Sequence, residues 1–419
     1  MLNNYCQVYQ KIWDLSSTNF PEFSKTYNRS EKIEKEEILD QYMNSIKYFR
    51  KVRFRRKGFS ESDKLAFLDN TKLFLSSGLD FDNCQLEMMF SDELISASKI
   101  FIKMARKFDA ELLFQDIFQA LRNVWIMNGL QLIMGIRMKI TPSVFAYSLL
   151  YPYTDNYIDD PKISRFEKMI FSERFRDRLS GEKIQPVNTT ENAIFRLVEL
   201  IENEYDRIDF PEVFESLLNI HEAQTSSIRL VQERETISES EIMQICLNKG
   251  GTSVLADGFL VAGHLSETQK SFLFGYGAYL QLLDDIQDVE EDFQDGLMTV
   301  FSKNAWNNPL DEKLNKTYWF GEEVMKSLDF FEGQHIPLFK SLMRKSMDLF
   351  IIEAIAQNQS AFSINYINQA ESSSPFQFSY IYQQKELLAP YHGLLLSTIN
   401  ELAFSDHVST EKSVFYTEC

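Results

Sequence analysis

Glycine and proline are scarce along this chain, and this scarcity limits the available folds more than any other feature. The 419 residues include 15 glycines and 10 prolines, too few to supply the turns of a many-stranded sheet. From Ser60 onwards apolar residues recur at helical spacing, without an alternating strand pattern. Hydrophobic residues form 44% of the chain, enough for a substantial core. The sequence therefore predicts an all-α globular protein.

Local signals predict where several helices begin and end. Thr141 and Pro142 have the order of an N-cap followed by the first helical residue, and Pro161 predicts the end of that helix. A second helix is expected from Pro211 to about Glu235. A third is expected as one continuous element over 267–292.

Two acid-rich strings lie in these helices, 129 residues apart. The first acidic string is Asp155-Asn-Tyr-Ile-Asp159-Asp160, and the second is Asp284-Asp285-Ile-Gln-Asp288. Each places carboxylates at positions i and i+4, hence on one face of a helix. Facing carboxylates repel unless hard cations lie between them. The strings therefore predict a Mg²⁺ cluster that binds a diphosphate.

The alternative interpretation of the second acidic string is a solvated acidic face. The apolar run from Phe272 to Leu283 favours a buried helix instead, and buried carboxylates need a metal or a partner. On this helix Gly277 and Gln281 share a stripe with Asp284. A glycine there would let a neighbouring element approach closely, and Gln281 could bond a phosphate oxygen or a bound water.

The second acidic string and its lead-in, Gly277-Ala-Tyr-Leu-Gln281-Leu-Leu-Asp284-Asp285-Ile-Gln-Asp288, resemble the second aspartate-rich motif of trans-prenyl diphosphate synthases. The first acidic string resembles the DxxxDD motif of squalene and phytoene synthases. Both belong to the class I isoprenoid synthase superfamily, and the resemblance extends over residues 60–350. We interpret 1–58 as an N-terminal extension and 59–419 as an α-helical catalytic domain with extra C-terminal helices.

The resemblance implies a bundle of antiparallel helices around a deep apolar cavity, with the two acidic strings facing each other at its mouth. It also implies Mg²⁺ as cofactor and a linear prenyl diphosphate as substrate. The expected catalytic residues are Asp155, Asp159, Asp284 and Asp288, and the expected metal ligands are these four together with Asp160 and Asp285.

Further polar residues are candidates for binding the substrate. Lys249, beside Gly250 and Gly251, resembles the diphosphate-binding lysine of the family, and the glycine pair indicates a kink or a close approach. Arg122 lies in an apolar helix, where its charge needs an anionic partner. The full candidate set is Lys249, Gln281, Arg122, Arg165, Gln224, Arg229 and Tyr279.

Some side chains have two open interpretations. The aromatic rings of Trp125, Tyr153, Tyr276 and Tyr279 could stabilise a carbocation or pack in the core. His221, in the segment between the two acidic strings, is either a buried core residue or a catalytic group.

Departures from the chain-elongating enzymes favour a reaction with one substrate. There is no Gly-Lys-x-x-Arg segment before the first acidic string and no Arg-Arg-Gly after it, and Asp295-Gly296 replaces the usual Gly-Lys. Few basic residues therefore remain for a second diphosphate. We expect a Mg²⁺-dependent terpene synthase. The alternatives are a prenyltransferase, either chain-elongating or squalene-type, and a non-catalytic lipid-binding or scaffold protein.

The distribution of charge along the chain limits the classes of molecule that the protein can bind. A net charge of −18 argues against nucleic acid as a general partner. The basic patch 47–57 has seven positive residues in eleven. It is a solvated helix end or arm, a lid over an anionic ligand, or a contact with anionic lipid.

Four widely spaced cysteines, no signal-peptide pattern and no long apolar run lead us to expect a soluble, cytoplasmic protein. The oligomeric state stays open, and a homodimer is one of the alternatives.

Overall fold

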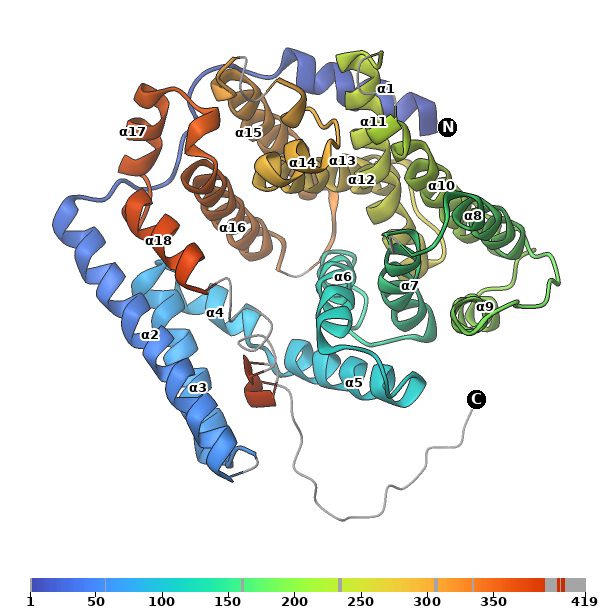
Figure 1. Ribbon diagram of the computed structural model, residues 1–419, viewed down its shortest axis with the longest axis horizontal. Helices are drawn as coiled ribbons and strands as arrows, with labels where there is room; N and C mark the ends of the chain where they lie inside the picture. Colours follow the sequence, from blue (N-terminus) through green and yellow to red (C-terminus); the bar gives the residue numbers. More distant parts are fainter. Residues whose placement is uncertain are drawn as a thin grey trace.

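The computed structural model describes residues 2–56, 58–159, 162–232, 236–304, 308–333, 335–388, 398–399 and 401–403. Within these residues the chain forms helices and no strand, which confirms the all-α prediction (Figure 1). The α-helices are α1 (Leu2–Leu15), α2 (Arg29–Arg56), α3 (Glu61–Leu73), α4 (Asn83–Met89), α5 (Asp92–Phe108), α6 (Phe114–Ile133), α7 (Pro142–Asp159), α8 (Arg165–Leu179), α9 (Thr189–Glu204), α10 (Pro211–Ser227), α11 (Arg229–Gln232), α12 (Glu239–Ala262), α13 (Glu267–Gln287), α14 (Val289–Asp295), α15 (Asp311–Lys326), α16 (Ile336–Gln357), α17 (Ile364–Ser372) and α18 (Phe378–Leu388). Short helical turns are η1 (Phe74–Gly78), η2 (Ser302–Asn304), η3 (Ser327–Phe330) and η4 (Gln359–Ala361).

Helices α12 and α13 pack along each other and carry much of the core. Their backbones touch at two glycines. A Cβ built on Gly277 would lie 2.1 Å from the carbonyl oxygen of Gly250, and one built on Gly250 would lie 2.2 Å from that of Gly277. No larger residue fits there. The close approach indicated by the sequence is therefore present, and α12 continues without interruption through the glycine pair.

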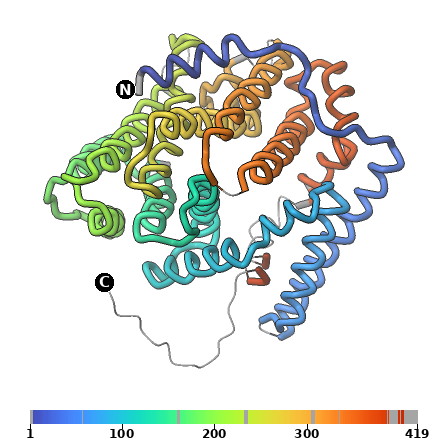
Figure 2. Tube along the Cα trace, turned by 180° about the vertical axis from the view of Figure 1, so that it is seen from behind, coloured from blue at the N-terminus to red at the C-terminus, as the bar shows by residue number. Residues whose placement is uncertain are grey.

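The N-terminal helix α1 lies across α12, α13 and α15 (Figures 1 and 2). The hydroxyl of Tyr9 donates to the carbonyl of Ser271 at 2.7 Å, and the indole N–H of Trp13 donates to Thr317 Oγ1 at 3.3 Å. Both aromatic rings are buried in the main core. The first part of the segment that we interpreted as an extension thus completes the central packing.

Two predicted boundaries illustrate what local signals can and cannot determine. Helix α7 begins at Pro142 as predicted, and Thr141 Oγ1 accepts the N–H of Val144 at 3.2 Å. The helix expected to run from Pro211 to about Glu235 ends earlier, at Ser227.

The prediction of one helix over 267–292 is wrong, because α13 ends at Gln287 and α14 begins at Val289. The buried amide of Asn358 donates to the carbonyls of Ile286 and Gln287, at 3.3 and 3.1 Å. These bonds provide partners for the last carbonyls of α13. Asp288 therefore sits at a bend between two helices.

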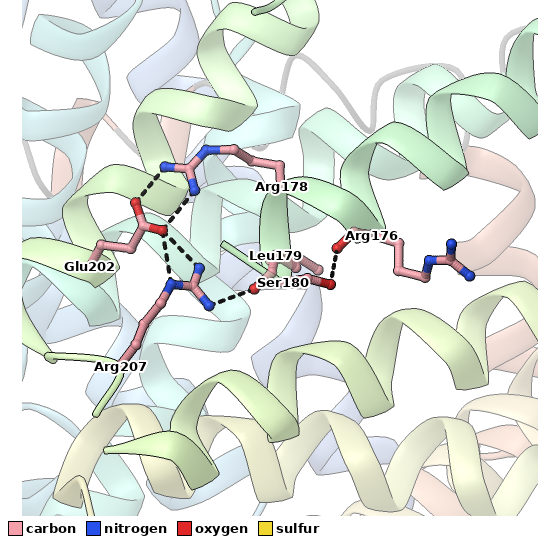
Figure 3. A network of polar contacts seen from close by, with 6 residues as sticks. All are labelled: Arg176, Arg178, Leu179, Ser180, Glu202 and Arg207. Carbon is pink, nitrogen blue, oxygen red and sulfur yellow. Dashed lines mark hydrogen bonds and ion pairs between the residues drawn. The ribbon is translucent and has the colours of Figure 1, made fainter. Parts of the chain in front are cut away.

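A network of ion pairs fastens α8 and α9 to the loop that precedes α10 (Figure 3). Glu202 accepts hydrogen bonds from the guanidinium groups of Arg178 and Arg207, and Arg207 Nη1 donates to the carbonyl of Leu179 at 2.8 Å. Burial raises the pKa of Glu202, but the two guanidinium groups outweigh it and hold this pKa below its usual range. The network helps to fix α8, which faces the candidate site.

Among the described helices, none combines the length and the apolar character needed to cross a bilayer.

A buried carboxyl group on α12 makes stability depend on pH. Asp257 is fully buried, and its Oδ1 accepts from Asn123 Nδ2 at 3.0 Å. Burial raises the pKa of Asp257 well above its ordinary value, although the Asn123 bond opposes this shift. Above about pH 4 the unfolded chain releases this proton while the folded chain keeps it. This group's contribution to the free energy of unfolding therefore decreases as pH rises from about 4 towards the folded pKa.

We expect Asp257→Asn to abolish this pH dependence. In the wild type, Asp257 lowers the free energy of unfolding by at most about 1.4 kcal/mol for each pH unit of increase. Urea unfolding of both proteins at pH 5 and pH 8 measures it, and the variant should lose less stability on going to pH 8. The exposed residue Asp69 provides the control, Asp69→Asn. Identical pH profiles for the wild type and Asp257→Asn would contradict a protonated Asp257.

Candidate functional site

One carboxylate from each acidic string acts on the hydroxyl of Tyr151. The side chain of Asp155 follows Tyr151 by one turn of α7, and Asp284 comes from α13. Desolvation, followed by the negative charges of Asp155 and Asp284, raises the pKa of the Tyr151 hydroxyl above its ordinary value. Both carboxylates therefore lie near the same hydroxyl. Asp284 and part of the Tyr151 side chain are exposed, whereas the Tyr151 hydroxyl is largely shielded from solvent.

Asp285 is directed towards α12. It is buried, and its Oδ1 accepts from Gln281 Nε2 at 2.7 Å. Its Oδ2 has no hydrogen-bond partner among the described residues. Burial raises the pKa of Asp285 to about 6, although Gln281 and the charge of Lys249 oppose this. Gln281 thus orients a carboxylate of its own helix, which differs from the predicted bond to phosphate.

The bend at Asp288 adds a carboxylate that the sequence analysis missed. Burial, and then the charges of Asp285, Asp288 and Asp284, raise the pKa of Asp292 to about 8. On one continuous helix Glu291 would share the stripe of Asp284; in the structure the charge of Glu291 acts on Asp288, and Asp292 joins the cluster as well. Asp292 could have been predicted from its position, because it follows Asp288 by four residues, the same spacing as between Asp284 and Asp288.

Two predicted basic residues lie beside the acidic strings. The charge of Arg122, exposed on α6, acts on Tyr151 and Asp288, and that of Lys249, half-buried on α12, acts on Asp285 and Asp292. Lys385 of α18 also acts on Asp288. No motif pointed to Lys385, which lies beyond the stretch that resembles the family.

Two of the other predicted substrate-binding residues have partners away from the acidic strings. Arg229 pairs with Glu241 at 3.3 Å, at the start of α12. The ring of Tyr279 packs on Gly321 of α15, where a Cβ would lie 2.1 Å from it. Tyr279 is nine residues from Asp288, half a helical revolution out of phase. The structure therefore does not bring Arg229 or Tyr279 to the acidic strings. Arg165 lies exposed at the first residue of α8.

The remaining aromatic candidates have structural partners. The indole N–H of Trp125 donates to Ser98 Oγ at 2.9 Å, and the hydroxyl of Tyr153 donates to Asp109 at 2.7 Å. The ring of Tyr276 stacks on Phe272. These contacts correspond to the core-packing alternative.

A small pocket of about 40 Å³ lies next to the acidic strings, between α7, α8, α10 and α12. It has room for about one water molecule. Its lining includes Tyr147, Tyr151, Phe175, Leu179, His221 and Gln224. Tyr147 and Tyr151 were not among the predicted site residues, although they precede Asp155 at intervals of four residues and so share its helix face.

His221 forms part of the wall of this pocket as a neutral ring. Its Nε2 lies 3.3 Å from Ser172 Oγ, and its ring meets Phe175 edge-on. Burial lowers the pKa of His221 below its ordinary value. The imidazole therefore carries no charge near pH 7, which matches the interpretation as a core residue.

The donor set suits Mg²⁺ that arrives with a phosphate ligand. Within the described residues, no three His, Cys, Asp or Glu side chains converge closely enough to hold an ion by themselves. The side chain of Asp159 and the whole of Asp160 lie outside that description. Mg²⁺ usually takes one or two carboxylates and completes its shell with water and phosphate oxygens. Burial and mutual repulsion raise the pKa values of Asp288 and Asp292, and a bound cation would relieve both effects.

No protein-family model and no curated protein matches this chain.

Proposed function

We propose that this protein is a Mg²⁺-dependent class I terpene synthase that ionises a linear prenyl diphosphate and converts the cation into a terpene. The main support is the position of Asp155 and Asp284, which come from two helices and act on one hydroxyl, that of Tyr151. Cationic side chains from two further helices, Arg122 and Lys249, flank the same acidic strings. Carboxylates on facing helices with cations beside them suit a diphosphate bound through Mg²⁺.

Each side chain then has a definite task. Asp155, Asp284 and Asp288 hold Mg²⁺ with the diphosphate, and Arg122 and Lys249 neutralise its outer oxygens. The chemistry that bound Mg²⁺ supplies is the withdrawal of charge onto the leaving group. The C–O bond breaks with its electron pair on the diphosphate, which leaves an allylic cation. Ring closure followed by proton loss, or direct proton loss, gives a hydrocarbon, and addition of water gives an alcohol.

The prenyl chain extends into the pocket between α7, α8, α10 and α12. At about 40 Å³ this pocket is far smaller than such a chain, so binding requires its walls to move apart. Tyr147 and Tyr151 are suited to this movement, because Tyr151 is exposed and the hydroxyl of Tyr147 makes only a long contact, 3.5 Å, with the Ser253 carbonyl. The proposal therefore requires that the deep apolar cavity implied by the resemblance opens when the substrate binds.

Product analysis tests the proposal. Purified protein with Mg²⁺ is incubated with geranyl, farnesyl, geranylgeranyl and longer prenyl diphosphates, each with and without isopentenyl diphosphate. A hydrocarbon or alcohol from one allylic diphosphate alone is the expected result. Product formed only with isopentenyl diphosphate would instead identify a chain-elongating prenyltransferase. No product and no diphosphate release would indicate a non-catalytic protein.

Arg122→Gln is expected to lower kcat/KM by about 10- to 150-fold. A hydrogen bond to a charged group contributes about 1.5–3 kcal/mol, and Arg122 is exposed, so the fold should be retained. Arg229→Gln is the matched control, since Arg229 pairs with Glu241, and it should change kcat/KM less than about twofold. Equal losses in both variants would contradict a specific role for Arg122.

A further inference from the structure

Helices α2 and α3 form a hairpin whose free end projects away from the other helices (Figures 1 and 2). A hydrophobic cluster separate from the main core lies on the hairpin, in which Met43, Ile46 and Phe49 of α2 meet Phe67 of α3 and Leu402 from further along the chain. This cluster uses one side of α2. The opposite side of its last turns is left to solvent.

We define the outward face of α2 as Lys47, Tyr48, Lys51, Phe54 and Arg55, all of them exposed. On a helix these positions fall within about 120° of one another. Phe54 is 75% exposed and Tyr48 is 58% exposed. Two aromatic rings and three cations therefore share one convex surface.

The charges of this face are available for an outside partner. Neighbouring cations of the basic patch are engaged within the protein, since Arg53 pairs with Glu401 at 2.5 Å and Arg56 with Asp63 at 3.6 Å. Among the described residues, no ion pair involves Lys47, Lys51 or Arg55. Their positive field stands out against the net charge of −18 for the whole chain.

We propose that the outward face of α2 docks this protein on an anionic lipid bilayer. Cations flanking exposed aromatic rings suit an interface where headgroups are negative and the acyl boundary is apolar. The face is convex and projecting, so it can reach a flat surface, whereas small ligands bind in hollows. Repulsion between the bilayer and the acidic remainder of the protein would orient the hairpin towards the lipid. The inference does not depend on the proposed reaction.

Vesicle flotation with the full-length chain tests the docking. Vesicles of phosphatidylcholine alone are compared with vesicles containing about 30% phosphatidylserine, at low and at high salt. The expected result is binding to the anionic vesicles only, weakened by salt. The triple variant Lys47→Gln, Lys51→Gln, Arg55→Gln should have a partition coefficient at least about tenfold lower. Each basic residue near an anionic bilayer increases the partition coefficient about fivefold. Phe54→Ser should weaken binding as well.

The matched control removes the same charge elsewhere. Lys11 of α1, Lys103 of α5 and Lys183 of the loop between α8 and α9 are exposed and lie outside the hairpin. Their replacement by Gln should leave the partition coefficient unchanged within about twofold. Circular dichroism verifies that each variant is folded. Absence of salt-sensitive binding by the native protein would overturn the proposal, as would equal losses in both triple variants. Tighter binding to a single-stranded oligonucleotide or an acidic peptide than to the vesicles would also overturn it.

Discussion

Replacing Asp284 by alanine is expected to abolish turnover of a prenyl diphosphate while the protein stays folded. The variant lacks a carboxylate that, like that of Asp155, acts on the Tyr151 hydroxyl and that lies one turn before Asp288. Loss of metal-assisted ionisation costs several kcal/mol, so kcat should fall by roughly a thousandfold or more. The rate of diphosphate release, with Mg²⁺ and substrate at saturating concentrations, measures this decrease in kcat.

Stability measurements separate a chemical effect from unfolding. The charge of Asp284 raises the pKa values of Asp288 and Asp292, so its removal relieves repulsion. Without Mg²⁺ the variant should be at least as stable as the wild type. Asp295→Ala, at the exposed end of α14, should retain activity within about twofold. Near-normal turnover by Asp284→Ala would refute the metal assignment.

Replacing Gly277 by alanine is expected to destabilise the fold severely. The new Cβ would lie 2.1 Å from the carbonyl oxygen of Gly250, which belongs to the backbone of α12 and cannot rotate away. The two central helices would have to separate, at a cost of about 3 kcal/mol or more. Urea unfolding, or the yield of soluble protein, measures the loss.

Gly129→Ala provides a matched comparison in another helix, α6. There the new Cβ would meet the end of the Phe339 ring at 3.2 Å, and a small shift of that side chain relieves the contact. Alanine also favours a helix over glycine by about 1 kcal/mol. We expect a net change within about 1 kcal/mol. Similar losses at both positions would show that the contact between α12 and α13 is not the cause.

Features governed by neighbouring residues could be predicted from the sequence. The start of α7 needed only Thr141 and Pro142. The helical period placed each acidic string on one face of its helix. The expectation that the two strings lie opposite each other came from the resemblance and not from helix periodicity; in the structure the charges of Asp155 and Asp284 both act on the hydroxyl of Tyr151.

Features governed by distant residues could not be predicted in this way. The bend at Asp288 depends on Asn358, which bonds the carbonyl of Gln287 across 71 positions of sequence. Beyond this bend the charges of both Glu291 and Asp292 lie near the second acidic string. Tyr279 faces α15 because Gly321 leaves room for its ring. Such outcomes depend on which helices meet, and periodicity alone cannot supply that information.

The position of α1 has a consequence for how the chain reaches its native state. This helix is synthesised before every element that it contacts, and its hydrogen bonds to Ser271 and Thr317 span 262 and 304 positions. Until α13 and α15 have formed, Tyr9 and Trp13 have no surface on which to pack. Contacts of such long range slow folding. We therefore expect docking of α1 to be among the last steps of folding, so that the apolar face of an amphipathic helix stays exposed to solvent until then, where a chaperone could bind it.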